Sequence, residues 1–378
     1  MKIIAIRAHP LRVELRAPFA FLQWRFTHRE TTLVSVCTDE GLVGWGEAYG
    51  PAMPSASVVR DFFAPLLAGR DPRDTEALWH FLYARSFDYG QKGTMVAALS
   101  ALDIAFWDIK SRAAGLPLYR FLGGAETESI PCYASGFYFR QPENLERQFA
   151  LEAEGYLGEG FPAMKMKVGL GVDRDAMLVG SMRRSIGPDV GLMIDANHAY
   201  SAVEAIALGR LVEPYRIGWF EEPVSHLNLE GYLEVKRRIA IPLAGGEGAY
   251  TRFGFQPLLH LRSVDYVQPD LCACGGVSEG LKIATLASIY GAHLTPHAWG
   301  SAVGLAAALH FYAALPGLPA SLVPVQKLLE YDRSENPLRS EIVAAPLRFS
   351  AGRLYLPQTP GLGIEVLEEK VQRCAAGS

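Results

Sequence analysis

Apolar runs alternate with longer amphipathic segments through the middle of the chain, and polar residues end these runs at a nearly constant spacing. Between about residues 128 and 330 the runs are AMKMKV, VGLMIDA, IGWFEEP, IPLAGGE, VDYVQPD and AHLTPH. Glu221 follows Asp195 after 26 residues, Glu247 follows after another 26, Asp270 after 23 and His297 after 27. Strands that alternate with helices predict a parallel β/α architecture.

The spacing also decides between two such architectures. A polar residue at the carboxyl end of successive strands is how a (β/α)₈ barrel builds its active site. A doubly wound sheet that binds a dinucleotide needs a glycine-rich turn after its first strand, and the chain has no G-x-G-x-x-G sequence. We therefore predict an α/β fold built on a (β/α)₈ TIM-type barrel.

The residues before and after the barrel have a different pattern. Residues 1–127 predict an α+β unit, in which TTLVSVCTDEGLVGWGEAYG forms a hairpin and DPRDTEALWHFLYARS and TMVAALSALDIAFWDIKSRAAG form helices. Gly115 is placed to cap the second helix. Residues 128–344 hold the barrel, and residues 345–378 return to a hairpin-like pattern in LRFSAGRLYLPQTPGLGIEV. No Pro- or Ser-rich linker separates these parts, so we expect packed domains.

Composition excludes several classes of function. The net charge is −4 and Lys and Arg form no cluster, which argues against a nucleic-acid partner or an anionic membrane. The five cysteines are odd in number and scattered, so we expect free thiols. Charged residues interrupt the N-terminal MKIIAIRAHPLRVEL before a signal-peptide core forms, and no apolar stretch is long enough to span a bilayer. We expect a soluble cytoplasmic protein.

Three of the strand-end residues are carboxylates. Asp195, Glu221 and Glu247 would converge at the barrel mouth from consecutive strands, and three oxygen ligands without a nearby thiol suit a hard cation such as Mg²⁺. Each carboxylate taken singly is better explained as a surface ion pair or a helix N-cap. The regular spacing of all three favours the metal site.

Two lysines lie one residue apart in the run GFPAMKMKVGLGV. On a strand, Lys165 and Lys167 share one face while Met164, Met166 and Val168 take the other. Two buried ammonium groups require an anion opposite them, and a substrate carboxylate bound to the metal could supply it. Asp270 and His297 would lie side by side on neighbouring strands, and such a pair suits general acid or base catalysis.

These motifs resemble the enolase superfamily, in its mandelate racemase subgroup, over nearly the whole chain. The resemblance rests on the Lys165-Met166-Lys167 motif and on seven further motifs, namely DANHAY, WFEEP, GGE, QPD, TPH, LEYD and the closing PGLGIEV. It implies a modified barrel, (β/α)₇β, with a capping domain formed by the N-terminal part and the C-terminal tail. It also implies proton abstraction α to a carboxylate, with an enediolate stabilised by one Mg²⁺.

The resemblance implies a role for each site residue. Asp195, Glu221 and Glu247 would hold the metal, Lys167 would be the base and Lys165 would stabilise charge. His297, paired with Asp270, would act on the opposite face of the substrate, and Glu330 would bond the second carboxylate oxygen. Which of Lys167 and His297 acts first stays open.

The reaction and the substrate contacts are less constrained. The chain is most similar to galactarolactone cycloisomerases, which implies ring opening of a sugar-acid lactone; the alternatives are an acid-sugar dehydratase, a racemase or epimerase, and a non-catalytic sugar-acid-binding relative. Specificity would lie in loops of the capping domain, with Arg25 and Gln23 as possible contacts, although the neighbouring aromatic residues could simply pack. Asn197, His198 and Trp299 are further candidates. The resemblance also implies a homo-oligomer, from dimer to octamer.

Overall fold

The N-terminal part of the chain forms a three-stranded antiparallel sheet with the order β1-β2-β3. The structure is a computed structural model, and it describes residues 1–140, 142–317, 322 and 325–376. The strands are β1 (Ile3–Phe21), β2 (Trp24–Thr38) and β3 (Val43–Ala48). Strand β2 pairs with β3 across the turn at Asp39-Glu40-Gly41, so the predicted hairpin is confirmed.

Helices pack on this sheet, with the buried α4 (Thr94–Ala113) against β3. Gly115 lies just beyond this helix with a φ of 68°, a left-handed conformation that glycine adopts without strain. The other helical segments of this unit are α1 (Ala52–Ser57), a π-helical turn (Val58–Phe63), α2 (Ala64–Leu67), α3 (Thr75–Arg85) and α5 (Leu118–Phe121).

Eight parallel strands form the barrel, as predicted. They are β4 (Ser129–Gly136), β5 (Ala163–Lys167), β6 (Gly191–Asp195), β7 (Ile217–Glu221), β8 (Leu243–Gly245), β9 (Tyr266–Val267), β10 (His293–Leu294) and β11 (Leu329–Asp332). Strand β11 pairs in parallel with β4, which brings the eighth strand beside the first. The helices between the strands are α6 (Leu145–Gly158), α7 (Val172–Ile186), α8 (Ala202–Val212), α9 (Leu229–Arg238), α10 (Thr251–His260), α11 (Gly276–Tyr290) and α12 (Ala302–Ala314).

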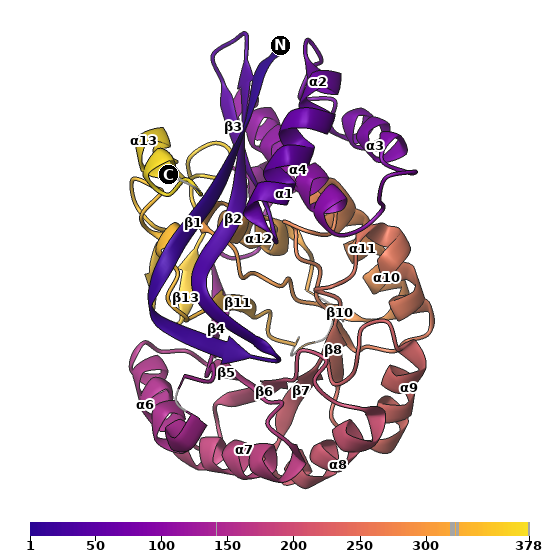
Figure 1. The fold of residues 1–378 in the computed structure, drawn as a ribbon, viewed down its shortest axis with the longest axis vertical. Coiled ribbons are helices and arrows are strands. Elements are labelled where there is room, and N and C mark those ends of the chain that lie inside the picture. The colour runs from indigo at the N-terminus through magenta and orange to yellow at the C-terminus, as the bar shows by residue number, and fades with distance from the viewer. Residues whose placement is uncertain (141, 318–321, 323–324, 377–378) are drawn as a thin grey trace.

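Strand β11 leads into the C-terminal tail instead of an eighth covering helix, which makes the barrel (β/α)₇β. In the tail, β12 (Phe349–Ser350) and β13 (Arg353–Tyr355) form a hairpin whose second strand pairs with the start of β4. Helix α13 (Glu368–Arg373) lies beside β1, and the Arg12 N–H donates to the Cys374 carbonyl at 2.8 Å. The tail therefore contacts both the barrel and the N-terminal unit (Figure 1).

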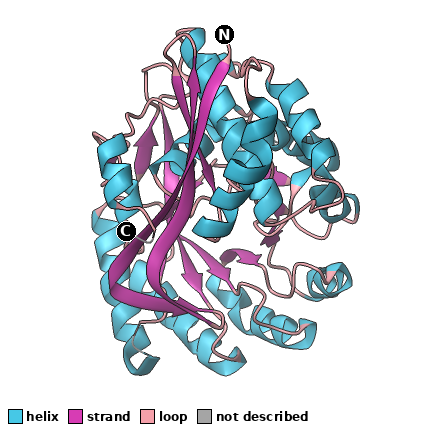
Figure 2. Ribbon diagram, turned by 45° about the horizontal axis from the view of Figure 1, so that its top comes forward, coloured by secondary structure: helices cyan, strands magenta, loops and turns pink. Residues whose placement is uncertain are grey.

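The long hairpin of β1 and β2 reaches from the N-terminal unit to the mouth of the barrel (Figures 1 and 2). Near its tip, Ala20 and Phe139 exchange two backbone hydrogen bonds of 2.8 Å, so the hairpin is attached to the segment after β4. The described residues also form short helical turns at Pro142–Asn144, Glu213–Tyr215 and Pro337–Arg339. Among the described residues, no helix has the length and apolar character needed to cross a membrane.

Strand β5 has the predicted alternation of side chains. Lys165 is paired with Met193 and Lys167 with Asp195 on the adjacent strand β6. Met164 and Met166 belong to the hydrophobic core between the strands and the helices, whereas both lysines face the carboxylates inside the barrel. Strand β5 therefore supplies apolar packing on one side and two cations on the other.

Candidate active site

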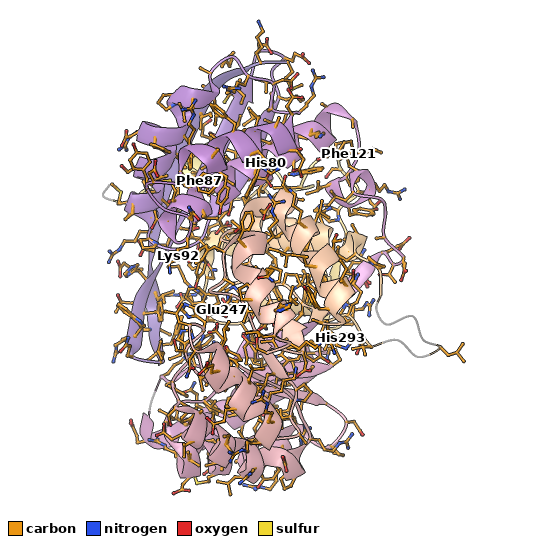
Figure 3. The ribbon with its side chains drawn as sticks, turned by 90° about the vertical axis from the view of Figure 1, so that its right-hand side faces the viewer. His80, Phe87, Lys92, Phe121, Glu247 and His293 are labelled. Atoms are coloured by element: carbon orange, nitrogen blue, oxygen red, sulfur yellow. The ribbon has the colours of Figure 1, made fainter. Side chains whose placement is uncertain are left out.

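The polar residues predicted to end the barrel strands lie together at the carboxyl ends of the strands. Six consecutive strands or the turns that follow them contribute Lys165, Lys167, Asp195, Glu221, Glu247, Asp270 and His297, and β11 adds Glu330. Most of these side chains are buried, while Glu247 is half-buried. Figure 3 shows Glu247 on one side of the barrel and His293, which begins a strand, on the other.

Lys165 contacts three carboxylates. Its Nζ forms a short ion pair with Glu221 Oε1, and it lies 3.0 Å from Glu330 Oε1 and 3.6 Å from Asp195 Oδ2. Burial would lower the pKa of Lys165, but Glu221 and Glu330 outweigh burial and raise this pKa well above its ordinary value. Lys165 is therefore a permanent cation at the floor of the site.

Lys167 lies nearer the barrel mouth. Its Nζ donates to Asp195 Oδ2 at 2.6 Å and to Asn197 Oδ1 at 2.7 Å. The same atom lies 4.6 Å from the ring centroid of Phe21, which comes from the hairpin tip. The anions opposite the two lysines are thus the strand-end carboxylates themselves, and the N-terminal unit covers the second lysine.

The three predicted metal ligands are oxygen donors at the ends of adjacent strands, a set that fits Mg²⁺. In the part of the chain that the structure describes, no three His, Cys, Asp or Glu side chains are arranged as they stand to hold an ion, and the two lysines contact Asp195 and Glu221 instead. Burial and neighbouring carboxylates raise the pKa of Glu221, even though Lys165 opposes this shift. A divalent cation would neutralise this crowded set of carboxylates.

A glycine turn places Glu247 at the mouth. Gly246 follows the short strand β8 with a φ of 123°, a conformation that L side chains rarely adopt. A Cβ at this position would lie 2.8 Å from Cε1 of Phe255 in α10. Only glycine therefore allows the chain to turn here and present Glu247 beside the other carboxylates.

His297 and Asp270 form the predicted pair. His297 Nδ1 lies 2.7 Å from Asp270 Oδ2, and Asp270 Oδ1 accepts the Cys272 N–H at 2.7 Å. The other ring nitrogen lies 3.4 Å from Glu247 Oε2. Burial would lower the pKa of His297, but the carboxylates of Glu247, Glu330 and Asp270 raise it to about 10. Asp270 thus orients the ring, which is a protonated, positively charged imidazolium at neutral pH.

Glu330 joins the two halves of the site. One of its oxygens contacts Lys165 Nζ at 3.0 Å, and the other accepts the Ala298 N–H at 3.0 Å, immediately after His297. The residue is buried at the second position of β11. The eighth strand therefore contributes a carboxylate between the lysine and the histidine.

The five predicted substrate contacts lie in different environments. Asn197 is buried and accepts from Lys167, and His198 Nδ1 lies 2.8 Å from the buried Glu222 carboxylate, beside His226. Trp299 packs against the aromatic residues of the hairpin. Arg25 is exposed on the hairpin, as is Gln23 at its tip. The structure thus brings Asn197, His198 and Trp299 to the mouth and leaves Arg25 in solvent.

The mouth contains residues that the sequence did not single out. Arg29 is buried, its guanidinium lies 3.6 Å from the ring centroid of Trp299, and it forms a short ion pair with Asp332. Tyr138 donates to Asp332 at 3.0 Å and accepts from the Trp299 indole at 2.9 Å. The sequence gives no signal for Arg29 beyond its being a charged residue in the THRETT stretch of β2. The nearby Arg25 is charged in the same way, so the sequence does not distinguish the two.

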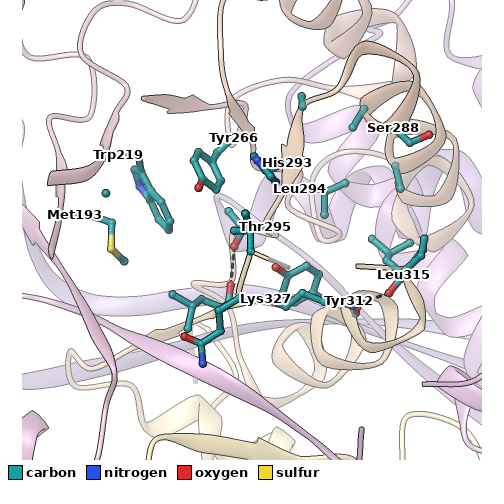
Figure 4. A pocket seen from close by; sticks show the side chains of 18 of the residues that line it. Met193, Trp219, Tyr266, Ser288, His293, Leu294, Thr295, Tyr312, Leu315 and Lys327 are labelled. Atoms are coloured by element: carbon teal, nitrogen blue, oxygen red, sulfur yellow. Dashed lines mark hydrogen bonds between the residues drawn. The ribbon is translucent and has the colours of Figure 1, made fainter. Parts of the chain in front are cut away.

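A separate cavity of about 470 Å³ lies at the opposite, amino-terminal ends of the strands (Figure 4). Trp219, Tyr266, His293, Tyr312 and Lys327 are among the side chains that line it. The Trp219 indole also donates to Glu221 Oε2 at 2.9 Å, so this side chain separates the cavity from the carboxylates. His293 stacks on Tyr266 here.

The fold and the site define a barrel enzyme with a capping unit and an acidic, lysine-containing mouth. A family model described as mandelate racemase / muconate lactonizing enzyme, N-terminal domain, matches residues 4–123, and one described as enolase C-terminal domain-like matches residues 148–370. The chain belongs to the mandelate racemase/muconate lactonizing enzyme family of the enolase superfamily.

Individual relatives are similar over almost their entire length. The D-galactarolactone cycloisomerase of Agrobacterium fabrum is 44% identical over 97% of both chains. The arabinonate dehydratase of Saccharolobus solfataricus is 33% identical over 89% of this chain and 88% of its own. The crystal structure of the 3,6-anhydro-D-galactonate cycloisomerase from Zobellia galactanivorans matches with a TM-score of 0.90, 40% identity and full coverage of both chains. A Streptomyces coelicolor racemase structure with bound magnesium has a TM-score of 0.89, 26% identity and coverage of 99% and 100%.

Proposed function

We propose that this chain is a Mg²⁺-dependent cycloisomerase that removes the proton α to the carboxylate of a sugar-acid lactone and opens the ring by β-elimination. The observation that carries the proposal is the position of Lys167 and His297 on the two flanks of the carboxylate cluster. A substrate bound between them would meet a base on one face and an acid on the other. The 44% identity to a D-galactarolactone cycloisomerase supports this choice of substrate.

The chemistry of the donor set supports the metal assignment. Asp195, Glu221 and Glu247 would hold the ion by their carboxylate oxygens. Bound there, Mg²⁺ would supply a Lewis acid that stabilises the negative charge developing on the substrate carboxylate. The magnesium reported in the Streptomyces coelicolor racemase structure supports the choice of ion.

The remaining roles follow from contacts of this chain. Lys165, held as a cation by Glu221 and Glu330, donates a hydrogen bond to the substrate carboxylate. Lys167 accepts the α-proton at its Nζ, and Asn197 orients that nitrogen. The enediolate then expels the lactone oxygen from the β-carbon as a carboxylate. The enol product takes one proton at the β-carbon and becomes a keto-deoxy acid.

A second candidate is the dehydration of an open-chain sugar acid. It would use the same proton abstraction, with hydroxide as the leaving group and the protonated His297 as the acid. The 33% identity to an arabinonate dehydratase favours this alternative over racemisation. A small sugar acid is the substrate class in either case, while a cytoplasmic homo-oligomer stays a prediction.

The test is proton NMR of the enzyme with Mg²⁺ in D₂O, against a panel of aldarates, aldonates and their lactones. Ring-opened product from galactarolactone with one solvent deuteron at the β-carbon supports the cycloisomerase. A keto-deoxy acid formed from an open-chain acid, with lactones inert, makes the enzyme a dehydratase. Exchange without elimination indicates an epimerase.

The Lys167→Met variant separates an enzyme from a binding protein. We expect it to lose turnover by at least about 10³-fold, because the general base is gone, and to keep ligand affinity. Lys2→Met, at an exposed position, is the matched control. Unchanged turnover in Lys167→Met would contradict the assignment of the base.

A further inference from the structure

Tyr49 is the first residue after β3, and it is attached to the barrel beside the catalytic pair. Its backbone N–H donates to the Cys272 carbonyl at 3.0 Å. The Cys272 N–H in turn donates to Asp270 Oδ1 at 2.7 Å. The N-terminal unit therefore places Tyr49 one backbone contact away from the carboxylate that orients His297.

A second attachment fixes the same stretch. Glu47 is fully buried and accepts the backbone N–H groups of Ser301, the N-cap of α12, and of Gly304, in the first turn of that helix, at 2.8 and 2.7 Å. A Cβ on Gly300 would lie 2.6 Å from Glu47 Oε1, so glycine permits this approach. The end of β3 is thus bound to the segments that follow both β9 and β10, and Tyr49 has little freedom to move relative to His297.

The side chain of Tyr49 faces the catalytic residues. Its ring is edge-on to His297, with centroids 5.8 Å apart, and 6.3 Å from Trp299. It is half-buried, and among the described residues no hydrogen bond of its hydroxyl is found. Burial and the charges of Glu247 and Asp270 raise the pKa of Tyr49 well above its ordinary value. The phenol is therefore a protonated donor without a protein partner at the mouth.

The depth of the site indicates which part of a substrate this donor would meet. Lys165 and the carboxylates are at the floor, so the substrate carboxylate belongs there. Tyr49 approaches from the capping side. The α-hydroxyl and then the lactone oxygen on the β-carbon would project away from this floor, so the lactone oxygen would lie nearer to the N-terminal unit and to Tyr49.

We infer that Tyr49 is a catalytic residue that donates a hydrogen bond to the oxygen leaving the β-carbon, an inference that rests on the proposed function. As the C–O bond breaks, its electron pair goes to the departing carboxylate oxygen and the electrons of the enediolate form the new carbon–carbon double bond. The phenol keeps its proton and stabilises the charge on the leaving oxygen. Tyr49 thus acts after the α-proton has been removed.

The test compares the parent enzyme, Tyr49→Phe and Tyr355→Phe on galactarolactone with Mg²⁺ in D₂O. Two rates are measured: deuterium exchange at the α-carbon of unreacted lactone, and ring opening. Tyr49→Phe keeps the ring that packs on His297, and Tyr355 is a control at the opposite end of the barrel. We expect ring opening to fall by about 10²-fold, as for the loss of one donor to developing negative charge.

The ratio of the two rates decides the outcome. If Tyr49 assists the leaving oxygen, exchange per ring opened rises at least tenfold in Tyr49→Phe and stays at the parent value in Tyr355→Phe. If Tyr49→Phe lowers both rates equally, Tyr49 acts only in packing. Partial unfolding of the variant cannot produce the expected result, because it also lowers both rates equally. Absence of exchange and ring opening in the parent enzyme would overturn the proposed function, and this inference with it. If the parent enzyme is active and Tyr49→Phe has the same ratio of exchange to ring opening as the parent, the role of Tyr49 is overturned while the proposed function stands.

Discussion

His297 Nδ1 lies 2.7 Å from Asp270 Oδ2, and this contact fixes the ring of a histidine that faces the carboxylate cluster. The two residues follow adjacent strands and are joined by a parallel backbone bridge. Asp270 is itself held by the Cys272 N–H. Backbone geometry therefore orients Asp270, and Asp270 orients His297 Nε2 toward the site.

Replacing Asp270 tests this orientation. An amide in Asp270→Asn cannot stabilise a protonated imidazole, so we expect kcat for ring opening to fall by about 10² to 10⁴. KM should change much less, because Asp270 is not expected to contact the substrate. Steady-state kinetics measure both, with the exposed Asp189→Asn as control. A change confined to KM would mean that Asp270 acts in binding.

Mg²⁺ should stabilise the folded protein. An ion that binds only the native state adds ~2.7 kcal/mol at a hundred times its Kd. We expect Mg²⁺ to raise the melting temperature of the parent enzyme and EDTA to reverse the rise. Glu247→Gln should lose most of this response, and Glu128→Gln, at an exposed site, should keep it. The same response in both variants would remove Glu247 from the ligand set.

His310 should make the protein less stable in acid. It is buried in α12, where Nδ1 accepts the Tyr119 N–H at 3.1 Å and Nε2 donates to the Leu362 carbonyl at 3.0 Å, and the contact at Nδ1 requires the neutral ring. Burial lowers the pKa of His310 to about 4, from 6.5. Between these two values the unfolded chain therefore binds a proton that the folded chain does not. The stability that the neutral His310 ring contributes above pH 6.5 is lost as the pH falls toward about 4.

The His310→Gln variant isolates this effect. A glutamine can accept and donate as the neutral ring does, but it does not titrate. From about pH 7.5 to about pH 5, we expect the parent to lose ~2 kcal/mol more stability than the variant. Denaturant unfolding at the two pH values measures the difference. Parallel losses would show that another group is responsible.

Glu47 should hold the N-terminal unit on the barrel. It accepts from two backbone N–H groups and the Ser301 hydroxyl of α12, and from Thr31 of its own sheet. Glu47→Gln places an amide NH₂ group against these donors, so we expect the free energy of unfolding to fall by about 2 kcal/mol or more. Thermal unfolding measures it, with the exposed Glu14→Gln as control. An unchanged melting temperature would contradict this role.

The barrel could be predicted because its information is local and repeated. Each strand is a short apolar run, each helix follows it, and the residue at the strand end recurs after 23 to 27 residues. Parallel strands place those residues at one edge whatever the details of packing. The alternation in AMKMK likewise determines which side of the strand the two lysines take. The resemblance to the family further predicted that the N-terminal part and the tail form a capping domain and that the barrel is of the (β/α)₇β type.

The walls of the site could not be predicted in this way. Glu47 meets Ser301 across 254 positions of sequence, and Arg29 meets Asp332 across 303. Such contacts have no period, because they depend on how the hairpin of one unit lies over the mouth of the other. Arg25 and Arg29 are equivalent in sequence, yet one is exposed and the other is stacked on Trp299. Local patterns determine the strand-end chemistry of this protein, whereas the docking of distant segments determines which residues enclose it.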